Sequence, residues 1–569
     1  MSRLQPRLKA TATSNVSPQS ASALSIPIPT SKEPLSRTAT PIARQNSRLP
    51  PADPVSDRAT LFLIRRTLCS HLSDKGRSTP APIDELLPPL TSSNEVDLQL
   101  YALIAIIIRE FVHTWYTKIT PDPYFVEEVV KIIAHCTRAL EQRLRKVDLE
   151  SLLFDELPDL LETHVRAYRI ANYSSHPPPL EGDPRRIYHS LWPFPALAPV
   201  PDNNGPLVQQ QLNNEAAYRQ LLVHGVLAVL LPTEDLENDC LTTLVGQIFS
   251  EMILGGGIGG KASEPWLLWE GITKIGETIQ TQLPNSKAAV RLDRSNSESS
   301  NQPPLDVTGG NTKGWNIGWS IQRTFWLILQ YAFLTFTTIR FLIVTVATSS
   351  SLPSRIPATK KLTGSAKTSD HISGPKPHSE RTSDATIRPL KRPIIKMKLW
   401  SCVSSLFDLA IRMPWLYGTI SMLQWGALAG PGELGNADGM LDKILSHAIQ
   451  TRVLDPSLLP LLLRNARAAL FPNNTLAPPR TIPSPAEQLL IRRRCAETIL
   501  SLMPAKMQDI YFGAVKERRV QEVEEVLNVF SDSYCNKHLL YGVVELIIVR
   551  LIPELSEKGV DELLDERLS

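Results

Sequence analysis

The sequence predicts an all-α protein, and three observations support this prediction. Apolar residues recur three and four positions apart through most of the chain, as at Leu61, Ile64 and Leu68, which is the spacing of an amphipathic helix. No segment shows the sustained apolar–polar alternation, bounded by turn dipeptides, that is typical of strands. Ser484 and Glu487 frame a proline in the pattern of a helix capping box. We therefore expect helices and no strands.

Taken in order, the predicted helices are separated by proline-rich or polar breaks. A helical pattern begins at Asp57, and the break at 78–95 follows it. The next helix, 97–116, is apolar on nearly every side, so we expect it to be buried or to contact lipid, and Pro121 and Pro123 end it. Further helices are predicted at 124–144, 149–169, 215–231, 233–254, 399–425, 437–452, 457–470, 485–503, 505–518, 521–531 and 536–552.

Composition divides the chain into helical regions and polar linkers. The 569 residues include 47 prolines against 27 glycines, with 42% hydrophobic residues. The predicted regions are a disordered basic tail (1–54), a helical domain (57–284), a polar linker (285–316), an apolar helix (317–349), a disordered basic linker (350–398) and a second helical domain (399–569). Each half contains helices too apolar to face water alone, so we expect the halves to pack into one elongated unit.

Basic residues are concentrated in the two predicted disordered regions. The net charge is only +3, which is too balanced for the whole chain to bind nucleic acid. Residues 1–50 carry seven Lys/Arg and one acid, and residues 350–398 carry eleven and three. Such arms either attract anionic surfaces or are simply solvated. The candidate basic residues of the linker are Lys360, Lys361, Lys391, Arg392, Lys396 and Lys398.

The most apolar stretch of the sequence is Phe325–Val344. It has about the 20 residues needed to cross a bilayer, but Arg340 and several polar residues make insertion only marginally favourable. Its polar residues fall on one side of the helix, which suits an interfacial helix, a spanning helix or a core helix. The candidate membrane-contacting residues are Phe325, Trp326, Phe333, Phe336, Arg340 and Phe341.

The sequence offers no catalytic, metal or cofactor site. The six cysteines are far apart and form no C-x-x-C pair, which excludes a clustered zinc site. The glycine-rich run Gly255–Lys261 resembles a phosphate-binding loop, but it follows a predicted helix rather than a strand. We therefore interpret it as a helix end and loop, and an NTPase is the remote alternative. The N-terminal residues contain no apolar run, so we expect no secretory signal.

Two neighbouring segments of the first half carry a family resemblance. Residues 106–129 (IIIREFVHTWYTKITPDPYFVEEV) and 138–168 resemble the Phox-associated (PXA) domain, with coverage of about 57–280. The motif positions are Arg109, Phe111, Trp115, Tyr116, Phe125, Arg143, Val147, Asp148, His164 and Tyr168. We expect Asp148 to cap the following helix and His164 to make a structural hydrogen bond. For Trp115 and Tyr116, core and lipid-facing roles stay open.

The second half carries a different resemblance. ARAALFPNN (466–474) and SYCNKHLLYGVVELIIVRLIPEL (533–555) are similar to the sorting-nexin C-terminal domain. The matching residues are Phe471, Pro472, Asn536, Lys537, His538, Tyr541, Pro553 and Glu554. Cys535, Glu545 and Ile552 depart from the family pattern, and the tryptophan motif is only partly present at Trp415.

Together the resemblances imply a non-enzymatic, membrane-associated protein of endomembrane trafficking or lipid handling. Full-length relatives carry RGS and PX domains between the two ends, and neither fits within 350–398. The first hypothesis is lipid binding, with acyl chains in an apolar groove lined by helices such as 97–116, 325–344 and 536–552. The alternative is a scaffold for proteins or phosphoinositide membranes without a lipid cavity. The expected partners are membrane lipids and trafficking proteins, at the cytosolic face of the endoplasmic reticulum, endosome or vacuole.

Overall fold

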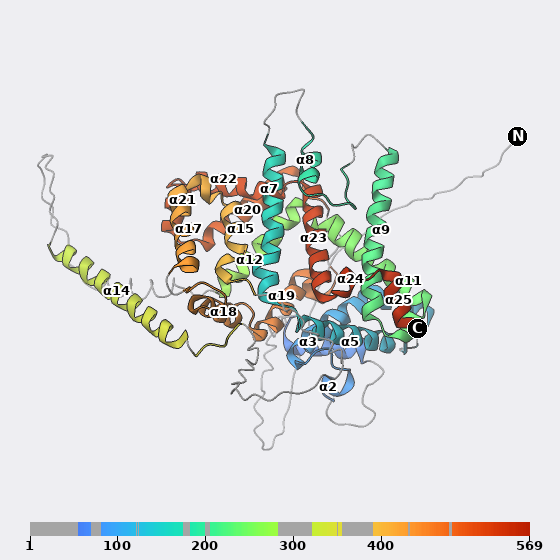
Figure 1. Cartoon of the computed structure of the whole chain (residues 1–569). Helices are drawn as coiled ribbons and strands as arrows, with labels where there is room; N and C mark the ends of the chain where they lie inside the picture. Colours follow the sequence, from blue (N-terminus) through green and yellow to red (C-terminus); the bar gives the residue numbers. More distant parts are fainter. Residues whose placement is uncertain are drawn as a thin grey trace, which may run out of the picture. The chain divides into compact units, whose positions relative to one another are not determined.

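A computed structural model describes residues 55–69, 81–120, 122, 124–173, 182–199, 205–282, 321–349, 351–355, 391–430, 433–476 and 481–569 (Figure 1). The predicted tail 1–54 and polar linker 285–316 lie outside these described residues, as do residues 356–390 of the basic linker. The chain divides into Met1–Ala52 and Asp53–Ser569, and every described residue belongs to the second unit. All regular elements in the described ranges are helical, which confirms the all-α prediction.

Most helices of the first half begin within three residues of their predicted starts, but α9 begins at Gly205 rather than 215, and the helices Pro184–Leu191 and Pro265–Gln282 were not predicted. The predicted helix 97–116 is part of a continuous helical run in which α3 passes into a π-helical segment, η1, and then α4. Asp148 caps α6 by accepting a hydrogen bond from the Ser151 amide, as expected. The elements are α1 (Asp57–Leu68), α2 (Ile83–Leu86), α3 (Asn94–Ile107), η1 (Ile108–His113), α4 (Thr114–Ile119), α5 (Tyr124–Leu144), α6 (Leu149–Ser151), η2 (Leu152–Glu156), α7 (Leu157–Asn172), α8 (Pro184–Leu191), α9 (Gly205–Leu230), α10 (Thr233–Leu236), α11 (Asp239–Gln247), η3 (Ile248–Ala262) and α12 (Pro265–Gln282).

The second half contains the capping box that the sequence predicted. The Ser484 side chain accepts from the Glu487 amide, and the Glu487 side chain accepts from the Ser484 amide. The elements are α14 (Ile321–Ser349), η4 (Ile394–Lys396), α15 (Leu399–Leu406), α16 (Leu409–Arg412), α17 (Pro414–Ala429), α18 (Met440–Arg452), η5 (Pro456–Leu458), α19 (Leu459–Leu470), η6 (Pro472–Asn474), α20 (Pro485–Leu502), α21 (Ala505–Phe512), α22 (Lys516–Val526), η7 (Leu527–Phe530), α23 (Ser533–Leu551), α24 (Glu554–Glu557) and α25 (Val560–Leu568).

Other local predictions are wrong as well. The predicted helix 399–425 is three helices, because Asp408 adopts a left-handed conformation and Pro414, which lacks an amide hydrogen, starts α17. The predicted loop at Gly255–Lys261 is helical, since it lies within the π-helical segment η3. No strand precedes it in the described chain, so the strand–loop–helix context of a phosphate-binding loop is not found there.

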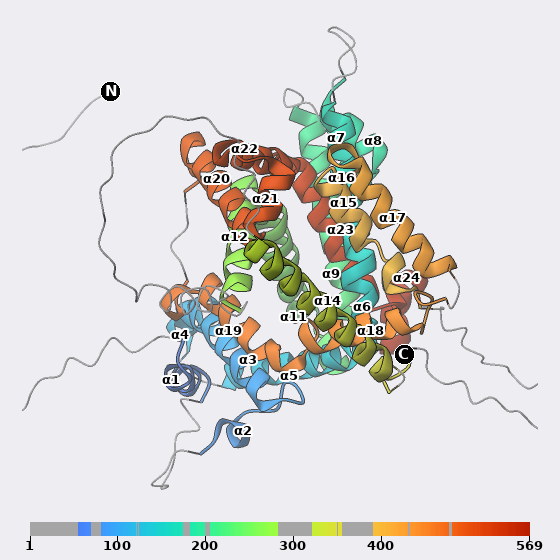
Figure 2. The same ribbon diagram turned by 90° about the vertical axis from the view of Figure 1, so that its left-hand side faces the viewer.

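The two halves share their hydrophobic cores. One core joins Trp266 and Trp269 of α12 to Val523 and Leu527 of the second half. The core of α1, α3 and α5 is completed by Phe471, and two further cores combine residues of α7–α9 with Cys535 or Tyr541. In Figures 1 and 2, α12 lies beside α20 and α23 beside α7, as their packing requires. Helices far apart in sequence therefore cover each other's apolar faces.

The ends of the predicted basic linker belong to the packed structure. Ile394, Ile395 and Met397 are buried, and Arg355 is only 8% exposed. The predicted boundaries at 350 and 398 are therefore wrong. Composition placed them by the density of basic residues, whereas burial of the interspersed apolar residues decides which positions pack.

Candidate functional site

A buried carboxylate, that of Glu215 in α9, collects hydrogen bonds from both halves. The Tyr541 hydroxyl donates to it at 2.7 Å, Arg219 pairs with it at 3.0 Å, and Lys537 lies 3.3 Å away. Burial and the neighbouring Glu215 raise the pKa of the Tyr541 phenol, so the hydroxyl stays protonated and donates. Two motif residues of α23 thus contact α9, which favours a structural role in joining the halves.

His164 also connects the two halves. Its Nε2 lies 3.0 Å from the carbonyl oxygen of Val529, and its Nδ1 lies 3.0 Å from the Tyr188 hydroxyl. A carbonyl only accepts, so Nε2 carries the proton and Nδ1 accepts from Tyr188. Burial lowers the pKa of His164 to about 4. This is the structural hydrogen bond that the resemblance led us to expect.

His538 is buried in an aromatic cluster at the same interface. Its ring centroid is 4.5 Å from that of Trp192 and 5.1 Å from that of Phe194. Burial, with a smaller contribution from the nearby His189, lowers its pKa to about 4. The neutral ring therefore packs as an aromatic side chain.

Other motif residues pair across the halves. Arg143 of α5 binds Glu554 at 2.9 Å. Arg109 donates to the carbonyl oxygen of Asn474, in the segment that follows α19. Asn536 is fully buried and donates to the carbonyl oxygens of Ser263 and Phe530. Two further motif residues pack against cores that include residues of the other half, Phe471 against the core of α1, α3 and α5 and Tyr168 against the core that contains Cys535. Pro472 starts η6 and Pro553 precedes α24.

The aromatic motif of the first half lies at the surface. Tyr116 stacks on Phe125 with centroids 4.8 Å apart, and Trp115 packs edge-on against both rings. Trp115 remains 44% exposed while its indole N–H donates to the carbonyl oxygen of Phe111. With its polar atom satisfied within the helix, the exposed ring offers an apolar surface.

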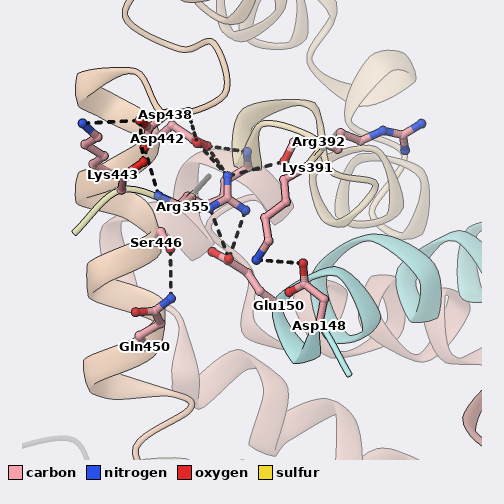
Figure 3. A network of polar contacts seen from close by, with 12 residues as sticks. Asp148, Glu150, Arg355, Lys391, Arg392, Asp438, Asp442, Lys443, Ser446 and Gln450 are labelled. Atoms are coloured by element: carbon pink, nitrogen blue, oxygen red, sulfur yellow. Dashed lines mark hydrogen bonds and ion pairs between the residues drawn. The ribbon is translucent and has the colours of Figure 1, made fainter. Parts of the chain in front are cut away.

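A buried ion cluster fixes the end of the segment that follows α14 (Figure 3). Arg355 lies between Glu150 of α6, at 3.0 Å, and Asp442 of α18, at 2.6 Å. All three side chains are at most 4% exposed. Burial alone would lower the pKa of Arg355, but the hydrogen bonds that it donates to Asp442 and Glu150, together with the charges of both carboxylates, raise it overall. The cluster therefore joins α6, α18 and the segment after α14.

The predicted basic linker residues fall into two groups. Lys391 pairs with Asp148, Arg392 with Asp155 and Lys398 with Asp159, at 2.8–3.1 Å. Lys396 is exposed on η4, and Lys360 and Lys361 lie outside the described residues. The acidic partners are all in or next to α6–α7. Three of the six side chains are thus paired with carboxylates of the first half.

The predicted membrane-contacting stretch forms α14, whose described side chains are all exposed. Phe333 is 69% and Phe336 62% exposed, and Arg340 is exposed as well. Phe325, Trp326 and Phe341 are helical, but their side chains lie outside the described part. The core-helix alternative is therefore wrong for the side chains that the structure describes. Such an apolar surface is unusual in contact with water.

A second exposed apolar helix, α17, was not singled out from the sequence. None of its residues is buried, and Trp415, Trp425 and Met422 are 66%, 70% and 76% exposed. Its signal in the sequence was the absence of any charged residue from Pro414 to Ala429. The sequence predicts this stretch only as part of a longer helix, 399–425, in which Trp415 is a partial match to the family's tryptophan motif.

Cavities and metal sites give no sign of catalysis in the described chain. No group of three or more His, Cys, Asp or Glu residues is arranged to hold a metal ion among the positions described. A cavity of about 170 Å³ lies between α2 and α3, beside Leu87, Leu98 and Tyr101. A more open hollow of about 440 Å³ adjoins it, beside Leu61, Ile83 and Leu98, and this volume falls within the roughly 300–1,000 Å³ of typical ligand pockets.

One helical stretch in the described ranges, Asp239–Ala262, is long and apolar enough to span a membrane by length and composition. It comprises α11 and η3, and its mean hydropathy over the best window is 1.3. Core helices of soluble proteins pass the same test, so this stretch alone carries little weight. Ser250 and Gly259 on it are buried against the rest of the protein.

Residues 93–275 match the family model of the PXA domain. The chain is similar to an uncharacterized protein of Saccharomyces cerevisiae, with 23% identity over 465 residues that cover 80% of this chain and 79% of that protein. It is 32% identical to PXA domain protein 1 of Schizosaccharomyces pombe over 25% of this chain and 26% of that protein. Human sorting nexin-25 is 34% identical over 16% of this chain and 10% of its own length. No solved structure matches the chain significantly.

Proposed function

The chain contains a PXA domain at residues 93–275, and from this premise we propose that it is a non-enzymatic, membrane-associated protein that binds lipid in endomembrane trafficking. The relatives named PXA domain protein 1 and sorting nexin-25 support the assignment to trafficking. The proposed location is the cytosolic face of the endoplasmic reticulum, endosome or vacuole. The likeness of the C-terminal half to sorting-nexin C-terminal domains stays a prediction.

The exposed apolar surface of α14 is the observation that carries this proposal. Its 29 residues contain only two charged side chains, Arg323 and Arg340, and every described side chain on it is exposed. Because exposed apolar surface is costly in water, a lipid environment would stabilise this helix by about 25 cal/mol for each Å² removed from water. The polar stripe predicted from the sequence suits a helix that lies at the lipid–water boundary.

Lipid binding in an apolar groove is the finer part of the proposal. Support comes from partly exposed apolar residues on packed helices, such as Trp115 of α4, Met252 of η3 and Ile547 of α23. The alternative is a scaffold that binds proteins or phosphoinositide membranes without a lipid cavity. Mass spectrometry of lipids that co-purify with the protein separates the two functions.

Membrane association is tested by flotation of the full chain with vesicles. We expect the wild-type protein to float and a deletion of 319–348 to remain at the bottom of the gradient. A milder variant, Phe333→Glu with Phe336→Glu, should weaken flotation without unfolding the protein, since both side chains are exposed. Leu221→Glu, on the exposed side of α9, is the matched control. A wild-type protein that does not float would overturn the proposal.

A further inference from the structure

We propose that α17 is a second lipid-contacting element, which lies in the plane of the membrane among the headgroups. The inference rests on the proposed membrane association but concerns a helix separate from α14. It assigns α17 a partner of defined chemistry, the headgroup and upper acyl region of a phospholipid layer. The exposure, charge, hydrogen bonding and length of α17 are those of a helix at the lipid–water boundary.

Exposure and charge distinguish α17 from an ordinary surface helix. A surface helix normally presents charged residues to water and buries an apolar stripe. In α17 no residue is charged, none is buried, and the most exposed side chains are Met422, Leu423 and Trp425, at 70–76%. The outward side of the helix is therefore its apolar side, which water does not stabilise.

Two polar side chains of α17 form hydrogen bonds within the protein. Thr419 donates to the carbonyl oxygen of Leu416 in its own helix. Gln424 donates to the carbonyl oxygen of Ile395 in η4. The other polar groups of the helix belong to Ser421 and to its tryptophan and tyrosine side chains. Protein interfaces are rimmed by polar and charged groups, whereas a helix without charge whose polar groups are mainly aromatic suits the lipid–water boundary.

Length and aromatic content place the helix in the interface and not across the bilayer. Sixteen residues span about 24 Å at 1.5 Å per residue, which is shorter than the roughly 30 Å hydrocarbon core. Trp415, Tyr417 and Trp425 are all at least 43% exposed. Tryptophan and tyrosine concentrate at the membrane–water boundary, where an apolar ring and a polar N–H or O–H are both accommodated.

Contacts at both ends hold α17 on the protein body. Arg412, just before the helix, pairs with Glu522 of α22. Near the other end, Gln424 is tied to η4, whose Ile394 amide donates to Asp442 of the Arg355 cluster. The exposed Lys396 follows Ile395 directly, so one basic side chain is close to the end of α17. A lysine next to an interfacial helix favours anionic lipid.

The inference is tested with an environment-sensitive probe on α17 of the full chain. Cys240, the exposed cysteine among the six, is replaced by serine, and NBD is attached to Leu423→Cys. The control probe is on Leu221→Cys, whose native side chain is similarly exposed on α9. Vesicles of equimolar phosphatidylcholine and phosphatidylserine are then added. We expect a blue shift and an intensity gain at position 423 and neither change at position 221.

The outcomes separate this inference from the proposed function. Flotation without a blue shift at position 423 overturns the role of α17 and leaves membrane association intact. A blue shift that appears without vesicles and grows with protein concentration means that a second copy covers the helix, which also overturns it. As a second measurement, Met422→Asp with Leu423→Asp should weaken vesicle partitioning at least about tenfold. Unchanged partitioning of this variant likewise contradicts the inference.

Discussion

Tyr541 of α23 packs directly against Gly259 of η3, so closely that a Cβ atom on Gly259 would overlap the tyrosine hydroxyl. The hydroxyl is held in place by its 2.7 Å hydrogen bond to Glu215. A residue of the second half therefore requires a glycine in the first half. Here glycine provides close packing, because Gly259 lies inside a helical segment and not in a turn.

This contact predicts that Gly259→Ala destabilises the protein. The added methyl group must displace Tyr541 or shift η3, and overpacking of this kind costs about 1–3 kcal/mol. Gly257→Ala is the matched control, since its Cβ would meet only the carbonyl oxygen of Met252 at 3.4 Å. Thermal denaturation should show a lower Tm for Gly259→Ala and an unchanged or higher Tm for Gly257→Ala. Equal Tm values would show that Tyr541 has room to move.

The buried ion cluster predicts unequal effects of two arginine substitutions. Arg355→Ala leaves Glu150 and Asp442 buried without their partner, which costs about 3–5 kcal/mol for a buried pair. Arg392→Ala removes an ion pair whose arginine is about half exposed, which costs at most about 1 kcal/mol. Chemical denaturation of the two variants checks this difference. Similar losses of stability would mean that water reaches the Arg355 cluster.

Much of the helical pattern was predictable, but the sites that join the halves were not. Ser484 and Glu487 form the expected capping box because that interaction is local. Arg355 was assigned to a disordered linker, because its partners Glu150 and Asp442 are 205 and 87 positions away. Only packing brings these residues together. For α17, the apolar composition was visible in the sequence, but whether those residues face a core or the surface depends on tertiary packing.

Acidification should weaken the interface between the halves. Burial lowers the pKa of His164 and of His538 to about 4, whereas both titrate near 6.5 in the unfolded chain. Between these values the unfolded state binds more protons, so stability is full above about pH 6.5 and falls as the pH drops toward 4. The loss is up to about 1.4 kcal/mol per pH unit for each histidine.

The measurement is the dependence of Tm on pH between about 6.5 and 5. Other groups titrate in this range, so the wild type is compared with His164→Gln combined with His538→Gln. The variant should have a lower Tm throughout and a shallower pH dependence. A pH dependence as steep as that of the wild type would mean that neither histidine is responsible for it.

The ion pairs of the basic linker predict a division among its six basic residues. Replacing Lys360, Lys361 and Lys396 by Gln should weaken binding to anionic vesicles, by about 1 kcal/mol for each residue near the surface. Replacing Lys391, Arg392 and Lys398 by Gln should matter less, because those side chains contact Asp148, Asp155 and Asp159.

Flotation is measured near 0.15 M salt, where the Debye length is about 8 Å and only close contacts count. The effect of replacing Lys360, Lys361 and Lys396 on vesicle binding should grow at low salt and fade at high salt. If all six replacements together leave binding at low salt unchanged, the basic linker is only solvated.

The shared cores predict that neither half folds alone. Trp266 and Trp269 of α12 pack against Val523 and Leu527, so separation would expose the apolar faces of both partners. Monomeric proteins rarely expose apolar patches above a few hundred Å². A division of the chain between Arg355 and Lys391 leaves Arg355 with the first half and its partner Asp442 with the second.

Expressed separately, residues 50–355 and 391–569 should each be insoluble or lack cooperative unfolding, and co-expression should give a soluble complex. We expect association without the covalent connection, because the shared cores consist of non-covalent contacts. Size-exclusion chromatography and thermal denaturation of the co-expressed pair provide the measurement, with Trp269→Asp as a variant that should prevent assembly. If residues 391–569 alone are monomeric and melt cooperatively, the second half is an independent domain. The groove proposed between the halves would then lose one of its walls.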